Sequence, residues 1–152
     1  MKWWKKVFGR FGDVDQVSYY DEGLALMAEG NTHEALTSFR LALKESPGDS
    51  SVLQQIAISY TRIGMTEEAE KTYRHVLQKS PDAAGAHYGL AFLLVRSGKD
   101  MDAIPHLRAF LENAPTGKEA GGHVSHARST LARITGEGEQ VVVEEGPQPE
   151  LF

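Results

Sequence analysis

The histidines are the side chains in this sequence best suited to binding a metal ion. His123 and His126 stand three residues apart, a spacing that on a helix brings two imidazole rings toward one ion. No further histidine, cysteine or carboxylate cluster lies nearby in sequence to complete a ligand set. We therefore predict that this pair faces solvent, and we predict surface or semi-buried packing roles for the four histidines expected on separate helices, His33, His75, His87 and His106.

Residues for other kinds of chemistry are missing from the sequence. There is no cysteine, which excludes disulfides, thiolate ligands and cysteine nucleophiles. There is also no glycine-rich phosphate loop, no nucleophile elbow and no paired-acid motif. We expect a protein that is not an enzyme and that carries no cofactor or metal.

Residues 1–15 form a basic, aromatic N-terminal segment. On a helical wheel its apolar side chains fall within an arc of about 140°, with the basic ones opposite. Such segments are typical of helices that lie on anionic membranes. We predict docking to a membrane surface or a partner through Lys2, Trp3, Trp4, Lys5, Lys6, Phe8, Arg10 and Phe11. Two alternatives remain open, namely a helix packed on the rest of the chain and a disordered tail.

Charge and hydropathy restrict the location and the partners. The net charge of −5 divides into +4 over residues 1–12 and −9 over the remainder. An acidic body argues against general nucleic-acid binding. No run reaches the roughly 18 apolar residues of a membrane span, and no signal peptide is indicated. We expect a cytoplasmic protein, attached peripherally to a membrane where the N-terminal segment binds one.

The strongest pattern in the sequence is a period of 34 residues. Three sets of residues share one register: Gly30, Gly64 and Gly98; Ala35, Ala69 and Ala103; Pro47, Pro81 and Pro115. A fixed period of this length is typical of stacked units that each bury an apolar face against their neighbours.

Each 34-residue unit is predicted to contain two helices and a tight turn. In the second unit, apolar residues at helical spacing run as far as Gly64, with Ser50 or Ser51 as the N-cap. Thr66 is the expected N-cap of the following helix. Pro105 falls near the end of the first turn of its helix, so we expect that helix to continue without a break.

These features resemble the tetratricopeptide repeat (TPR) family over residues 16–117. The matching residues are Gly23, Gly30, Ala35, Phe39, Ala42 and Pro47; Leu53, Ala57, Tyr60, Gly64, Ala69, Tyr73 and Pro81; and Leu90, Ala91, Gly98, Ala103 and Pro115. The resemblance implies an all-α solenoid of three helix-turn-helix repeats at 16–49, 50–83 and 84–117. We expect a C-terminal capping helix at 118–136, whose inner face carries Val124, Ala127, Leu131 and Ile134, and an acidic, disordered tail at 137–152.

The resemblance also implies a concave groove lined by the first helix of each repeat. The corresponding residues are Tyr20, Leu24 and Met27; Gln54, Ile58 and Arg62; and Tyr88, Phe92 and Arg96. Aromatic and arginine side chains are enriched at interface hot spots, so we predict binding of a peptide with apolar anchors and an acidic group near the arginines. The alternative for some of these positions is packing between helices.

TPR proteins that bind chaperones hold a peptide's carboxylates with lysine, asparagine and arginine side chains. The positions that match here are Tyr20, Leu24, Gln55, Gly85 and Gly89, and none of them carries a charge. The resemblance therefore predicts that this chain does not bind peptides in that way.

The sequence favours a non-catalytic adaptor or scaffold that binds a peptide or helix of another protein, without nucleic acid. One alternative is a self-assembling homo-oligomer, in which the N-terminal segment or tail of one copy lies in the groove of another. A second alternative is a regulatory subunit of an enzyme or of a secretion complex.

Overall fold

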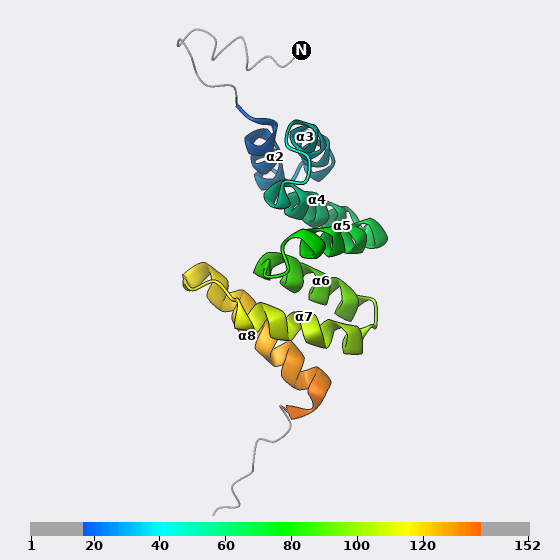
Figure 1. The fold of residues 1–152 in the computed structure, drawn as a ribbon, viewed down its shortest axis with the longest axis vertical. Coiled ribbons are helices and arrows are strands. Elements are labelled where there is room, and N and C mark those ends of the chain that lie inside the picture. The colour runs from blue at the N-terminus through cyan, green and yellow to red at the C-terminus, as the bar shows by residue number, and fades with distance from the viewer. Residues whose placement is uncertain (1–16, 138–152) are drawn as a thin grey trace, which may run out of the picture.

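The computed structural model describes residues 17–137, and this part of the chain is an elongated stack of α-helices (Figure 1). The helices are α2 (Tyr19–Ala28), α3 (Thr32–Glu45), α4 (Ser50–Ile63), α5 (Thr66–Lys79), α6 (Ala84–Arg96), α7 (Asp100–Glu112) and α8 (Lys118–Thr135). Three helix pairs followed by a single helix confirm the predicted all-α repeat architecture. The N-terminal segment at 1–15 and the tail beyond Glu137 lie outside the described residues.

The 34-residue period is visible in the backbone of the turns inside each pair. Gly30, Gly64 and Gly98 have φ values of 82°, 83° and 74°, a left-handed conformation that glycine adopts without steric cost. The amide after each glycine donates to the carbonyl five residues before it: Asn31 to Leu26 at 2.8 Å, Met65 to Tyr60 at 2.9 Å, and Lys99 to Leu94 at 2.8 Å. These bonds close the ends of the first helices, as predicted for the glycines.

The expected N-caps of the second repeat were each placed one residue or more too late. Asp49 caps α4, because its carboxylate accepts the backbone amides of Ser51 at 2.9 Å and Val52 at 3.2 Å. Ser50 and Ser51 are the first two residues of that helix. Thr66 is likewise the first residue of α5 and makes no capping bond. A carboxylate one position earlier can reach two free amides, which explains the preference for Asp49.

Helix α7 runs through Pro105 without interruption, as expected. Proline has no amide hydrogen, so only the carbonyl of Met101 loses a helical partner. The proline ring faces solvent. The cost of this residue is therefore confined to one bond near the start of the helix.

The helices form two layers. The first helix of each pair lies in one layer, which we call the inner layer, and α4 contacts α6 directly within it. The second helices, α3, α5 and α7, form the outer layer. Helix α8 packs on α7 and extends the inner layer beyond α6, and in Figure 1 its first turns project to the left of the stack.

The apolar core consists of two clusters. One is built from α2, α3 and the inner face of α4, with Phe39 fully buried at its centre. The other extends from α4 to α8 around Tyr73, Leu90 and Leu94. Side chains that are partly buried against both clusters come from α3 and α4, namely Leu43, Ile58 and Tyr60.

The C-terminal helix covers the end of the second cluster, as predicted for a capping helix. Ala127 is fully buried, and Val124, Leu131 and Ile134 pack against the same cluster. Arg128 lies on the opposite, exposed side of the helix. In the described part of the chain, no helix combines the length and the apolar character needed to cross a membrane.

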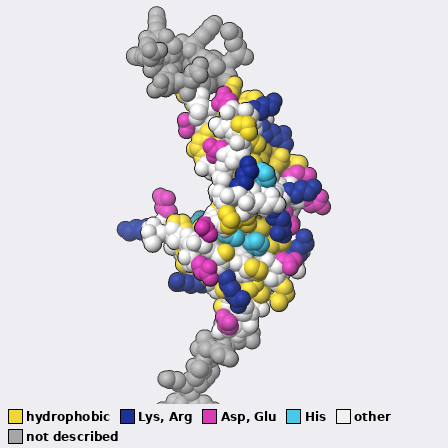
Figure 2. Space-filling model, in the orientation of Figure 1, with side chains coloured by type: hydrophobic (Ala, Val, Ile, Leu, Met, Phe, Trp, Pro, Cys, Tyr) yellow, Lys and Arg dark blue, Asp and Glu magenta, His cyan; other side chains and the backbone are white. Residues whose placement is uncertain are grey.

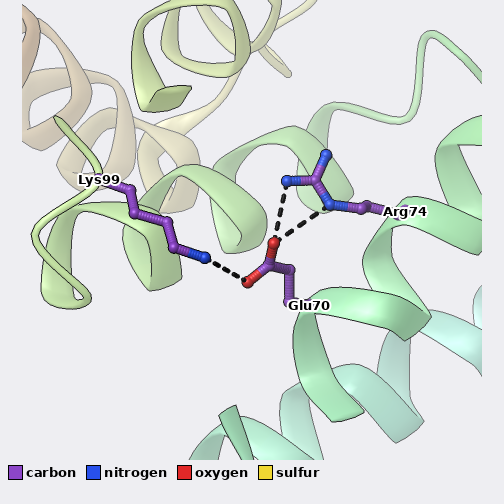
Figure 3. A network of polar contacts seen from close by, with 3 residues as sticks. All are labelled: Glu70, Arg74 and Lys99. Atoms are coloured by element: carbon purple, nitrogen blue, oxygen red, sulfur yellow. Dashed lines mark hydrogen bonds and ion pairs between the residues drawn. The ribbon is translucent and has the colours of Figure 1, made fainter. Parts of the chain in front are cut away.

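A small polar network joins two outer helices (Figure 3). Arg74 donates to Glu70 from Nη2 at 3.0 Å and from Nε at 3.3 Å, and Lys99 Nζ lies 3.6 Å from the other carboxylate oxygen. The hydrogen bonds from Arg74 are the main cause that lowers the pKa of Glu70. The network connects α5 to the residue that precedes α7, and so links the second repeat to the third.

Candidate functional site

Four of the nine predicted groove side chains are exposed on the inner layer. Leu24 on α2 is 36% exposed and Phe92 on α6 is 38% exposed, which is unusual for large apolar side chains. Arg62 and Arg96, at the ends of α4 and α6, are exposed as well. The layer therefore presents both apolar and cationic groups to solvent.

The two arginines are held by neighbouring groups. Arg62 Nη1 donates to the backbone carbonyl of Met27 at 3.5 Å, which joins the end of α4 to the end of α2. The guanidinium carbon of Arg96 lies 5.7 Å from the ring centre of Phe92, in cation–π geometry. Both guanidinium groups keep N–H donors for further acceptors.

The other predicted groove residues contribute more to packing. Met27 is only 7% exposed, and its sulfur accepts the Ser59 hydroxyl at 3.6 Å. It therefore presents little surface to a ligand, and the structure gives no support for its predicted binding role. Tyr20, Gln54 and Ile58 are half-buried. Their neighbours are Phe39 for Tyr20, Gly85 for Gln54, and both core clusters for Ile58.

Tyr88, the ninth predicted residue, lies at the centre of an aromatic group shared by α6 and α8. Its ring centre is 4.7 Å from that of His123 and 4.9 Å from that of Phe110. Its hydroxyl forms a 2.9 Å hydrogen bond with Nδ1 of His126. Burial raises the pKa of Tyr88 above its ordinary value of 10.0. His123 and His126 thus pack on a groove residue from a helix outside the repeats.

A pocket of about 160 Å³ lies between α6 and α8, next to this aromatic group. Its lining residues are Tyr88, Ala91, Phe92, Val95, Leu107, His126, Thr130 and Arg133, and none of them is acidic. Arg133 also lies 3.8 Å from a carboxylate oxygen of Asp100, with both side chains about half exposed. The pocket therefore has an apolar floor and a guanidinium group at its rim.

A second pocket, of about 370 Å³, lies at the opposite end of the stack, between the starts of α2 and α4. Its lining residues are Ser18, Tyr20, Ala42, Glu45, Ser46, Asp49, Ser51 and Val52. The charges in this lining are the two carboxylates of Glu45 and Asp49. The charged side chains that line the two pockets are thus of opposite sign. Over the face shown in Figure 2, in contrast, acidic and basic side chains are interspersed.

Sequence reasoning missed a contact between His87 on α6 and His106 on α7. Their Nδ1 atoms are 3.0 Å apart, and Nε2 of His87 lies 2.6 Å from the carbonyl oxygen of Pro81. A carbonyl can only accept, so Nε2 of His87 carries a proton and, in neutral His87, Nδ1 accepts from His106. The repeat register held a signal, because His87 stands 34 residues after the buried Leu53.

The pKa of His106 is lowered, chiefly because burial disfavours its charged form. The nearby His87 and Arg74 lower it further, and the carboxylate of Asp102 acts in the opposite direction. Between residues 17 and 137, no three histidine, cysteine or carboxylate side chains converge as a metal site would require.

Two family models, both described as tetratricopeptide repeat, match residues 17–49 and 55–118. Together the matched segments make up more than half of the sequence, and they cover α2 and α3 and the stretch from the middle of α4 to the end of α7. The chain belongs to the tetratricopeptide repeat family. No curated protein sequence matches this TPR chain.

Solved structures of TPR proteins resemble the chain over most of their length. The type III secretion chaperone SycD of Yersinia enterocolitica, in complex with a peptide of the translocator YopD, has 16% identity and a TM-score of 0.71. That match covers 79% of this chain and 92% of SycD. PcrH of Pseudomonas aeruginosa, in complex with the chaperone binding region of PopD, has 14% identity and a TM-score of 0.69, with coverage of 79% and 90%.

A third similar structure is the second TPR domain of human RPAP3 in complex with an HSP70 peptide. It has 20% identity and a TM-score of 0.65, and the match covers 78% of this chain and 93% of that domain. At these identities the likenesses establish a shared TPR fold.

Proposed function

We propose that this TPR protein is a non-catalytic adaptor that binds a segment of another protein along its inner layer. The observation that carries the proposal is the combination of exposed Leu24, Phe92 and Arg96 with the apolar pocket between α6 and α8. Three TPR structures of similar fold are complexes with peptides, which supports the same use of this one.

The ligand that fits this surface has apolar side chains followed by acidic ones. The pocket between α6 and α8 has room for an aliphatic side chain, and Arg96 and Arg133 offer bidentate donors to carboxylates beside it. The positions that hold carboxylates in chaperone-binding TPRs are uncharged here, including Gly85 and Gly89. We therefore propose a partner whose acidic groups lie next to α6 and α8.

The groove can be tested by changing Phe92→Ala together with Arg96→Ala. Both side chains are exposed, so the fold should tolerate their loss, while truncation of an aromatic–arginine hot spot typically weakens binding by about tenfold or more. Binding is measured by fluorescence anisotropy with apolar–acidic peptides selected from a display library. Met101→Ala is the matched control, because Met101 is 74% exposed on an outer helix.

The adaptor proposal is overturned if the double variant binds the selected peptides as tightly as the unchanged chain. It is also overturned if the Met101 control loses affinity to the same degree, since the binding surface would then lie on the outer layer.

We further propose that the N-terminal segment attaches the adaptor reversibly to an anionic membrane on the cytoplasmic side. The support is the separation of aromatic and basic side chains in the sequence of residues 1–11, which lie outside the described part of the chain. Each basic residue near an anionic surface contributes roughly 1 kcal/mol at low salt.

Full-length protein is expected to sediment with phosphatidylserine vesicles and to be released as the salt concentration rises. Replacing Trp3 and Trp4 with alanine should reduce sedimentation, because the rings no longer enter the interface. Vesicles of neutral lipid are the control. Equal sedimentation of the double variant and the unchanged chain would exclude docking through this segment.

A further inference from the structure

We infer that residues 138–152, the acidic tail that follows α8, occupy the pocket between α6 and α8 of the same molecule. Lying there, the tail competes with the partner for the inner layer, so removal of the tail contact increases partner affinity. The competition rests on the proposed function, whereas the contact between tail and pocket does not.

The pocket offers two kinds of contact in a defined arrangement. Its floor is apolar, made by Ala91, Phe92, Val95 and Leu107, and its lining contains no carboxylate. Arg133 stands at the rim, and its ion pair with Asp100 is long and partly exposed, so water and salt weaken it. The pocket thus accepts an apolar side chain on its floor and a carboxylate at the rim, beside Arg133.

A chain that returns along α8 from Glu137 meets Arg133 first and Thr130 and His126 after it, and the tail carries its groups in that order. Glu139 comes first, and Val141, Val142 and Val143 follow it. Residues 138–152 contain four glutamates and no lysine or arginine. A carboxylate that meets a guanidinium group forms the stronger, charge-assisted kind of hydrogen bond.

The tail begins beside the pocket and is long enough to enter it. Gly136 has φ 75°, a left-handed conformation that ends α8 and turns the chain. Thr130 and His126 lie about 10 and 16 Å back along the helix from Glu137, at 1.5 Å per residue. The valines follow Glu137 by four to six residues and reach about 13 to 20 Å in extended chain. They can therefore lie beside both lining residues.

Charge and position distinguish the tail from the other terminal segment. The pocket between α2 and α4 contains the carboxylates of Glu45 and Asp49, which repel glutamates. Its lining residues come from α2, α3 and α4, and these helices lie at the far end of the stack from α8 (Figure 1). The positively charged residues 1–12 would in turn be repelled by the guanidinium group of Arg133 at the α6–α8 pocket. The acidic tail is the occupant that matches this site.

Paramagnetic relaxation measured on the full-length chain tests the contact. The sequence contains no cysteine, so Gln148→Cys provides a single thiol for a nitroxide label. We expect broadening of amide signals from residues 88–96 and 126–133 at low salt, without any added partner. Glu139→Lys with Glu144→Lys should abolish the broadening, because Glu139 is the carboxylate that reaches Arg133. The matched control is Glu34→Lys with Glu67→Lys, the same charge change at exposed sites of the outer layer, and it should leave the broadening intact.

Three results would overturn the inference. The first is no broadening of signals along α6 and α8. The second is broadening that persists when the two tail glutamates are replaced by lysines. The third is broadening that arises only between a labelled and an unlabelled copy mixed together, which would show that the tail binds a second molecule. Because no partner is added, these results are independent of whether the adaptor proposal holds. If the tail contact and the adaptor proposal both hold, the glutamate-to-lysine changes in the tail should also tighten binding of the selected peptides.

Discussion

His106 shows how one neighbouring ring determines the charge that a residue can carry. Its imidazole lies against that of His87, and the hydrogen bond between their Nδ1 atoms requires one of the two nitrogens to be unprotonated. Protonation of both rings would remove that bond and place two positive charges side by side. The pair therefore stabilises the junction of α6 and α7 only while at least one ring is neutral.

The stability of the protein should therefore fall in mild acid. The folded-state pKa of His106 is lowered from the ordinary value of 6.5, so the unfolded chain takes up this proton at a higher pH. The stability that neutral His106 contributes is fully present above the unfolded-state pKa of 6.5. This stability is lost as the pH falls from 6.5 toward the lower pKa of the folded state. Urea denaturation between about pH 7.5 and pH 5.5 measures the slope. His106→Gln should flatten the slope.

The exposed His33 supplies the control for this measurement. His33→Gln removes a histidine of α3 and leaves the His87–His106 pair intact, so the difference between the two variants isolates the effect of the pair. If His106→Gln and the unchanged chain have the same slope, the histidine pair does not couple protonation to folding.

At the residue scale, the sequence predicted those features that the 34-residue period requires in every repeat. The glycine at position 30 and its two equivalents end helices because each needs a left-handed backbone, and glycine meets that need in any neighbourhood. The split between exposed Leu24 and buried Met27, three residues apart on α2, was not predictable. It depends on how α4 packs against α2, where Ser59 and Arg62 contact Met27.

At the scale of elements, α6 comes unusually close to the repeat before it. A Cβ atom on Gly89 would overlap the ring of Tyr73 on α5, and one on Gly85 would lie 2.8 Å from Oε1 of Gln54. The absence of a side chain at Gly89 is therefore what allows α6 to pack against Tyr73, whereas the flexible end of Gln54 could move away from a side chain at position 85. The two glycines also remove charge from the positions that chaperone-binding TPRs use.

Two glycine substitutions should have opposite effects on stability. Gly89→Ala inserts a methyl group into the packed junction and should lower the free energy of unfolding by about 1–3 kcal/mol. Gly121→Ala, on an open face of α8 with no atom within 4 Å of the new Cβ, should raise it by up to about 1 kcal/mol, because alanine favours helix. Chemical denaturation measures both. A neutral or stabilising Gly89→Ala would show that the junction has room.

Helix α8 marks the limit of what sequence reasoning gave for the elements. Its apolar face was predicted correctly, because the residues follow helical spacing. The contact of α8 with Tyr88 was not predicted, because α8 lies outside the 34-residue period that relates the other helices. The two histidines noted for their spacing thus have a place in the site that only the packing of α8 on α6 defines.

For the molecule as a whole, the two core clusters predict uneven resistance to opening. Repeat proteins are stabilised mainly by contacts between neighbours, so a local loss spreads only as far as those contacts carry it. Phe39 is fully buried in the first cluster, and Leu107 holds the equivalent position in the second. Each truncation should therefore act mostly on its own end of the stack.

Phe39→Ala should lower stability by about 3–5 kcal/mol and speed amide hydrogen exchange in α2 and α3 more than in α7 and α8. Leu107→Ala should produce the reverse pattern. Native-state exchange followed by NMR measures both. A uniform acceleration along the chain in each variant would show that the stack unfolds as one cooperative unit.

The overall architecture was predictable because it repeats, whereas the opposite signs of the two pockets were not. The net charge of the chain is a sum and carries no information about which end holds Glu45 and Asp49 and which holds Arg133. That separation arises only when helices from different repeats are stacked in order.

The side chains that touch both core clusters have a mechanical consequence. Leu43, Ile58 and Tyr60 are only partly buried, and Tyr60 is tied to Arg40 by a 2.6 Å hydrogen bond from the guanidinium group. Because these partly buried side chains are the ones shared by the two clusters, we expect the stack to bend most easily at this junction. If the proposed adaptor function holds, a partner that spans α2 to α8 would cross this junction, and its affinity would include the energy needed to bend the stack to fit it.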